Sequence, residues 1–117
     1  MIDDCREKGA TPILVSLTPR NEWPNGKIER RNGSYGKWYR EIVAETGVDF
    51  LDLHNISADF LDKKFASKSE EKSKKAASKY FKKDHTHTSL IGARMNAQSI
   101  AKGLRAIHSK LADGLKK

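Results

Sequence analysis

Apolar positions along the chain follow two periods, which together predict alternating strands and helices. Residues 12–18 form a short, nearly continuous apolar run between turn residues, and residues 48–53 form a second short strand-like run. Such runs are typical of strands buried on both faces of a parallel sheet. Between them, apolar side chains recur at i, i+3, i+4, i+7 and i+8 from Tyr35 to Val43, which predicts a helix that ends at Gly47.

Shorter helices are predicted before and after this unit. Residues 1–8 are typical of the last turns of a helix, because Gly9 follows and glycine readily takes the left-handed conformation that ends helices. Residues 56–65 predict a short helix, and either Asn55 or Ser57 could cap its first turn.

The longest helical pattern lies near the C-terminus. Apolar positions from Leu90 to Leu111 are separated by alternating steps of three and four residues, and Thr88 or Ser89 stands where an N-cap is expected. The order of elements predicts an α/β fold with a right-handed crossover between parallel strands. Two such strands leave an unpaired apolar edge, so we expect further strands or another chain to cover it.

Composition and charge add one local feature to this chain of 117 residues, whose net charge is +8. Residues 63–83 contain nine lysines and two glutamates, and therefore hold +7 of that excess. We interpret the segment as a solvated helical insert whose few contacts come from Ala76, Ala77, Tyr80 and Phe81. Contact with an acidic polymer is a weaker alternative, and nucleic-acid binding is disfavoured because the segment has no arginine.

The cysteine count and the hydropathy of the chain address disulfides, membrane spans and signal peptides. Cys5 is single, so no disulfide within the chain is expected. No run of 18 apolar residues occurs, and no charged-then-apolar leader precedes the first helix, so we expect neither a membrane span nor a signal peptide in these residues.

The candidate chemistry lies directly before the last helix, where Asp84 stands three residues ahead of His87. A histidine can act as the base that activates a serine, and a carboxylate can fix its tautomer and stabilise the imidazolium. His85 competes for the same carboxylate. A metal site that uses Asp84, His85, His87 and His54 is an alternative, but it lacks a Cys pair or a helical His-x-x-x-His.

The nucleophile of such a catalytic group has no counterpart in the chain. Residues 32–36 are the only near match to a Gly-x-Ser-x-Gly elbow, but they lack the first glycine and follow a loop where a strand is required. Ser34 is better explained as the N-cap of the helix that it precedes.

Several segments in order resemble one family. Residues 83–93 contain Asp-x-x-His followed by Gly-Ala, and residues 9–15, 18–20 and 47–54 agree as well. This pattern is similar to the C-terminal block of SGNH (GDSL-type) hydrolases, and most similar to the rhamnogalacturonan acetylesterase group. The resemblance covers most of the chain apart from the lysine-rich residues 63–83.

The resemblance implies a partial domain over residues 1–117, the C-terminal part of a three-layer α/β/α flavodoxin-like sandwich. It implies ester hydrolysis on acetylated pectic polysaccharide without metal or organic cofactor, with His87 as general base and Asp84 as its carboxylate. The family's Gly-Asp-Ser nucleophile and oxyanion-hole residues have no match here, so this chain alone should be inactive. A missing N-terminal half, or a second copy, would complete the sheet, and the family setting is secreted or periplasmic.

A long loop, residues 19–34, follows the first predicted strand, and open α/β sheets bind ligands at this end of their strands. Trp23 could stack on a sugar, and Arg20, Asn21 and Arg30 could bind its polar groups. A non-catalytic module that binds acidic polysaccharide or a partner is the alternative function.

Overall fold

The computed structural model of the chain describes residues 1–30 and 34–115, except for the side chains of Ser34 and Tyr35. The prediction that Ser34 caps a helix therefore lies outside the described part. The elements, in chain order, are α1 (Ile2–Glu7), β1 (Ile13–Val15), η1 (Pro24–Gly26), α2 (Ser34–Thr46), β2 (Asp49–Leu51), α3 (Leu53–Phe65), α4 (Glu70–Ala77), η2 (Ser78–Tyr80), α5 (Leu90–Ala106) and η3 (Lys110–Gly114).

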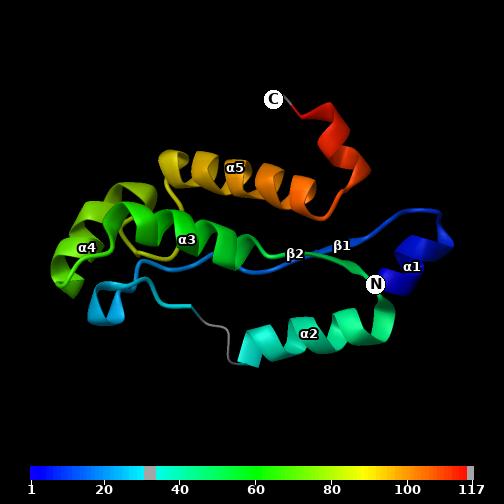
Figure 1. Cartoon of the computed structure of the whole chain (residues 1–117), viewed down its shortest axis with the longest axis horizontal. Helices are drawn as coiled ribbons and strands as arrows, with labels where there is room; N and C mark the ends of the chain where they lie inside the picture. Colours follow the sequence, from blue (N-terminus) through cyan, green and yellow to red (C-terminus); the bar gives the residue numbers. More distant parts are fainter. Residues whose placement is uncertain (31–33, 116–117) are drawn as a thin grey trace.

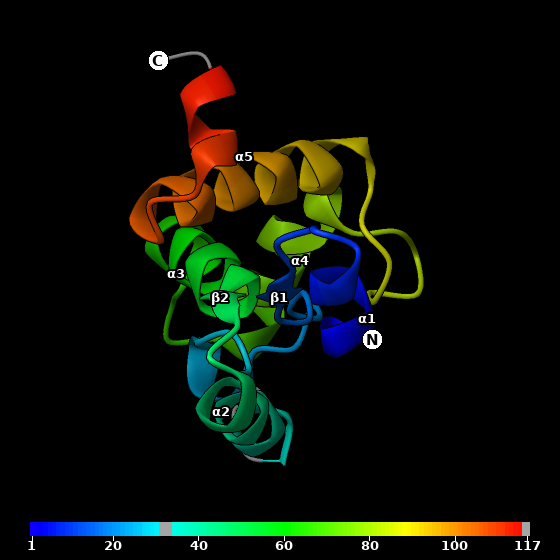
Figure 2. The ribbon, with the colours of Figure 1, turned by 90° about the vertical axis from the view of Figure 1, so that its right-hand side faces the viewer.

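The two strands pair in parallel, with Ile13 opposite Asp49 and Val15 opposite Leu51. Helix α2 lies on one side of the strands and α5 lies on the other, as two perpendicular views show (Figures 1 and 2). The predicted α/β class with parallel strands is confirmed. The strands are shorter than predicted: β1 covers Ile13–Val15 and β2 covers Asp49–Leu51, and just beyond β1 the backbone N–H of Ser16 still donates to the Leu51 carbonyl at 3.2 Å.

The outer edge of β1 has no strand beside it among the described residues, where β1 pairs with β2 alone. At the end of this edge, Val15 is 39% exposed and Leu17 is 53% exposed. The exposure of two large apolar side chains beside unpaired backbone is the arrangement expected of an incomplete sheet.

Capping residues decide where two of the helices begin. Ser89 accepts a hydrogen bond from the backbone N–H of Gly92, so Ser89 caps α5 as one of the two predicted residues. The cap predicted for α3 was wrong, because Asp52 accepts from the N–H of Asn55 and starts the helix at Leu53. At its other end α5 stops at Ala106, since His108 takes a left-handed φ of 54° and the chain turns into η3.

The main core lies beyond the carboxyl ends of the strands. The lysine-rich segment contributes to it through Ala77, Tyr80 and Phe81, which are buried as predicted. Ala76 was wrongly placed among the contacts, since the buried face of α4 carries Ser73 and Ala77, one turn apart, and Ala76 is exposed. The full cluster consists of Trp23, Ile28, Ala58, Leu61, Ala77, Tyr80, Phe81 and Met95.

Candidate functional site: the Asp84–His87 loop and the adjoining pocket

The Asp84 and His87 side chains face each other in the tight loop that leads into α5. His87 Nδ1 lies 2.5 Å from Asp84 Oδ2. The other carboxylate oxygen of Asp84 accepts hydrogen bonds from the backbone N–H groups of Thr86 and His87, each at 2.9 Å. The carboxylate is thus held by the loop it belongs to, and it holds the imidazole in turn.

These contacts favour the ionised form of Asp84. The hydrogen bond with His87 lowers the pKa of the Asp84 carboxyl well below its ordinary value of 3.8, and the two backbone N–H donors lower it further. With Nδ1 directed at a carboxylate, the neutral imidazole carries its proton there and leaves Nε2 as the base. No described protein group lies within hydrogen-bond distance of Nε2, and the His87 side chain is 74% exposed.

We expect the Asp84 carboxyl to titrate below pH 3.8 in the folded chain, as ¹³C NMR of the side-chain carboxyl between pH 7 and 2 would measure. Because the folded pKa is lowered, the contact stabilises the loop above pH 3.8 and is lost as pH falls through the lower folded value. His87→Ala should move the pKa part of the way back, since the two backbone donors remain. An ordinary Asp84 titration in the parent chain would show that the contact does not form in solution.

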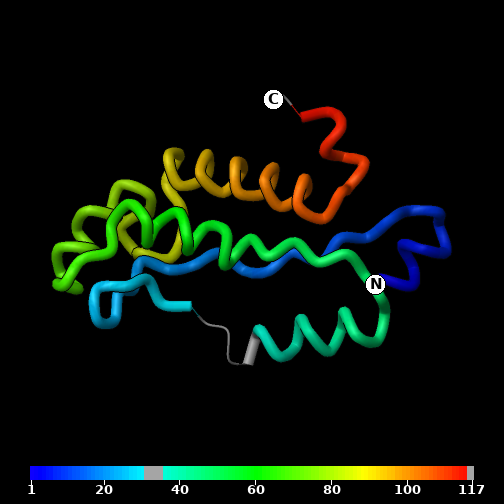
Figure 3. Tube along the Cα trace, in the orientation of Figure 1, coloured from blue at the N-terminus to red at the C-terminus, as the bar shows by residue number. Residues whose placement is uncertain are grey.

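His85, the competing histidine, has a different partner. Its φ of 58° turns the backbone, and its Nδ1 accepts a hydrogen bond from Asn21 Nδ2 at 2.9 Å. The backbone N–H of Asn21 also donates to the His85 carbonyl at 2.8 Å. Asn21 therefore links the loop after β1 to the Asp84–His87 loop, and the two loops lie at the same end of the molecule (Figure 3).

A pocket of about 370 Å³ opens at the carboxyl ends of both strands. Ser16 follows β1 and donates its hydroxyl to Asp52, which follows β2, at 3.2 Å. The remaining lining residues come from the ends of the strands, the loop after β1 and the first turns of α2 and α3: Leu17, Thr18, Arg20, Gly36, Tyr39, Arg40, Phe50, His54 and Asn55. Asp84 and His87 do not line this pocket.

The four side chains expected to bind sugar lie in different surroundings in the structure. Arg20 lines the pocket and is exposed. Trp23 is 3% exposed, and its indole N–H donates to the side-chain oxygen Oδ1 of Asn21 at 2.6 Å, so it offers no stacking face. Asn21 is fully buried and also donates to the Lys74 carbonyl. Both residues were misassigned, because their neighbours in the core, and not their position in a loop, decide what they contact.

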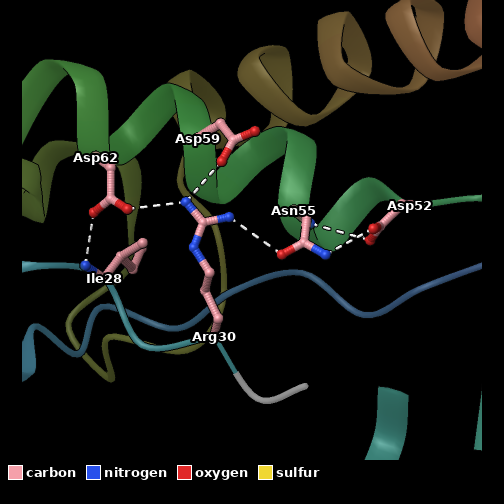
Figure 4. Close-up of polar contacts among 6 residues, drawn as sticks. All are labelled: Ile28, Arg30, Asp52, Asn55, Asp59 and Asp62. Carbon is pink, nitrogen blue, oxygen red and sulfur yellow. Dashed lines mark hydrogen bonds and ion pairs between the residues drawn. The ribbon is translucent and has the colours of Figure 1, made fainter. Parts of the chain in front are cut away.

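Arg30 is also engaged with the protein. Its guanidinium forms ion pairs with Asp59 at 2.7 Å and Asp62 at 2.9 Å, and it donates to Asn55, so it clamps the long loop onto α3 (Figure 4). Burial lowers the pKa of Arg30, but the hydrogen bonds and charges of the two carboxylates outweigh this and raise it. Because the guanidinium group of Arg30 is already bound to these three side chains, it does not suit the sugar-binding role expected of it.

Of the residues that line the pocket, the sequence predicted only Arg20 as a sugar-binding residue, and Tyr39 and Arg40 are among those it missed. Tyr39 was taken as part of an apolar helix face, but its hydroxyl accepts from the backbone N–H of Leu17 and its ring lies 5.4 Å from that of Phe50. Arg40 lines the pocket without an ion pair to any described residue. A helical period shows which side chains share a face of the helix, but it does not show which other part of the protein packs against that face.

No group of three or more His, Cys, Asp or Glu side chains among the described residues is arranged to hold a metal ion. His54 Nδ1 donates to the Leu17 carbonyl, away from the Asp84 loop. Among the described helices, none is long and apolar enough to cross a bilayer.

Comparison with known proteins gives two relatives, while no protein-family model matches the chain. The chain is 31% identical over 119 residues to "Probable rhamnogalacturonan acetylesterase YesY" of Bacillus subtilis, covering 97% of this chain and 51% of the relative. It is 27% identical over 99 residues to "Rhamnogalacturonan acetylesterase" of Emericella nidulans, covering 84% of this chain and 37% of the relative. The chain thus spans about half, or less, of the length of these relatives.

The relationship to rhamnogalacturonan acetylesterases expected from the sequence is confirmed by these matches, which extend over most of the chain. The observed α/β layers with parallel strands agree with it. The relationship concerns the part of the relatives that is aligned.

Proposed function

We propose that this chain supplies the general base and the orienting carboxylate of a serine-type carbohydrate acetylesterase. The observation that carries the proposal is the 2.5 Å contact between His87 Nδ1 and Asp84 Oδ2, in a loop where two backbone N–H groups hold the carboxylate. Both side chains stand at the entry to α5, with the imidazole exposed and Nε2 available to another group.

In the proposed mechanism, His87 Nε2 takes the proton of a serine hydroxyl as the oxygen attacks the acetyl carbonyl. Asp84 stabilises the imidazolium through Nδ1–H. The imidazolium then gives its proton to the departing sugar oxygen, which leaves an acetyl-serine. Water activated by His87 hydrolyses this intermediate to acetate and restores the serine.

The attacking serine and the oxyanion donors belong, in this proposal, to polypeptide other than these 117 residues. Two observations support it: the outer edge of β1 is unpaired beside exposed Val15 and Leu17, and the Bacillus subtilis relative is about twice as long as the matched region. An N-terminal half, or less simply a second copy, would add strands to that edge.

The substrate follows from the names of the two relatives, which act on rhamnogalacturonan as acetylesterases. We propose an acetylated pectic polysaccharide as the substrate. We also propose a secreted or periplasmic location, where the protein would encounter such polymers. The pocket contains Arg20 and Arg40, neither of which forms an ion pair with another described residue, and it favours a second candidate function, a non-catalytic module that binds acidic polysaccharide.

We expect the 117-residue chain alone to hydrolyse a synthetic acetyl ester no faster than background, because catalysis needs the nucleophile and the oxyanion donors together. A chromogenic acetyl ester, assayed with the parent chain and His87→Ala side by side, tests this. Turnover well above background that vanishes in His87→Ala would show that the nucleophile lies within these residues.

A further inference from the structure

The segment of residues 63–83 carries nearly all of the net charge of the chain. Its nine lysines, which we call the lysine surface, are all exposed: Lys63, Lys64, Lys68, Lys72, Lys74, Lys75, Lys79, Lys82 and Lys83. The ion pairs of the described residues involve Arg30, Lys37, His87 and the N-terminus, and none involves these lysines. Glu70 and Glu71 offset two of these nine charges, and the remaining excess of +7 on one segment is self-repelling, so a bound polyanion would relieve that repulsion.

Aromatic rings hold two of these lysines in place. Lys64 Nζ lies 5.6 Å from the centre of the Phe60 ring and 5.7 Å from that of Tyr80, and it donates to the Tyr80 hydroxyl at 3.1 Å. Lys79 Nζ makes a separate contact with the same ring, 5.8 Å from its centre. Cation–π contacts of this kind reduce the entropy lost when a lysine binds an anion.

The lysine surface joins the Asp84–His87 loop directly. The N–H of Lys82 donates to the His87 carbonyl at 2.7 Å, and the N–H of His85 donates to the Lys82 carbonyl at 2.9 Å. Ser89, the cap of α5, donates its hydroxyl to the Lys79 carbonyl. The backbone that carries the lysines is therefore the backbone that positions the histidine.

We propose that the lysine surface binds an acidic polysaccharide and guides it to the Asp84–His87 loop. This inference rests on the proposed function for its substrate class, and on the charge distribution for its site. The match to the Bacillus subtilis relative covers 97% of this chain and therefore extends over residues 63–83 as well.

The chemistry of the surface favours a polyuronate over a nucleic acid. Single-stranded nucleic acids are bound through exposed aromatic rings, but within residues 63–83 Tyr80 and Phe81 are 5% and 6% exposed and Phe65 is half-buried, which leaves Phe60, 38% exposed, as the one accessible ring beside these described lysines. The segment has no arginine to fork onto phosphates or bases. Lysine ammonium groups are mobile point charges, which suits carboxylates repeated along a flexible chain.

The test measures binding of oligogalacturonate to the 117-residue chain by calorimetry, with neutral galactan oligomers of equal length for comparison. The variant carries Lys63→Gln, Lys68→Gln, Lys72→Gln and Lys75→Gln, all exposed and outside the Asp84–His87 loop; a matched control carries Lys8→Gln, Lys27→Gln, Lys102→Gln and Lys110→Gln, which lowers the net charge equally. We expect the surface variant to bind oligogalacturonate about tenfold more weakly, with a flatter dependence on salt, and the control to change less than about threefold.

Three outcomes would overturn the proposal: no binding of oligogalacturonate at low salt, equal losses in both variants, or tighter binding of a single-stranded oligonucleotide of equal charge. The result is independent of the proposed catalysis. In a reconstituted esterase, the surface variant should retain turnover of a small acetyl ester, so a failed binding test and a failed hydrolysis test point to different errors.

Discussion

Replacing His87 with alanine should lower kcat by about 10⁴-fold or more in an enzyme reconstituted from this chain and the part of the Bacillus subtilis relative that it does not match. The physical reason is that a serine hydroxyl is a weak nucleophile near neutral pH without a base. Turnover of a synthetic acetyl ester by the two polypeptides, expressed together, measures the effect.

Two further variants sharpen this prediction. Asp84→Asn should cost about 10³–10⁴-fold, because an amide can no longer hold the imidazole in the required tautomer or stabilise its charge. His108→Ala is the matched control, since His108 is an exposed histidine outside the loop, and it should leave turnover unchanged. Equal activity of His87→Ala and His108→Ala would remove His87 from the mechanism, and no turnover in any mixture would favour the binding module.

The second large effect concerns stability. Gly92→Ala should lower the free energy of unfolding by about 2–4 kcal/mol, although alanine is the better helix former by about 1 kcal/mol. A Cβ at Gly92 would lie 1.9 Å from the Tyr80 carbonyl oxygen, which is backbone and accepts the Ser89 N–H at 3.1 Å. Helix α5 would have to move away from η2, and urea denaturation measures the cost.

Gly114→Ala provides the control for this variant, because a Cβ there meets nothing within 4 Å. We expect its free energy of unfolding, measured with urea, to match that of the parent within about 0.5 kcal/mol. The displacement of α5 should also disturb the loop before it, so Gly92→Ala should raise the pKa of Asp84 toward its ordinary value. A Gly92→Ala chain as stable as the parent would mean that the close approach of α5 to Tyr80 does not exist in solution.

The sequence alone predicted the parallel strands, the helices between and after them, and the Asp84–His87 pair. These are local features: a strand or helix shows itself by its period, and an Asp-x-x-His pair can fold back within a single loop. The cap at Ser89 and the turn at Gly9, where φ is 78°, are local for the same reason.

Tertiary structure alone decided which loop side chains remain free. Asn21 and Trp23 resemble ligand-binding residues in the sequence, but contacts with His85, Lys74 and the core bury both of them. Arg30 is occupied by carboxylates that lie 29 and 32 positions further along the chain. The period of apolar residues shows which residues share a face within one element, whereas burial depends on which distant element packs against that face. The pocket lined by Tyr39 and Arg40 could therefore be identified only from the tertiary structure.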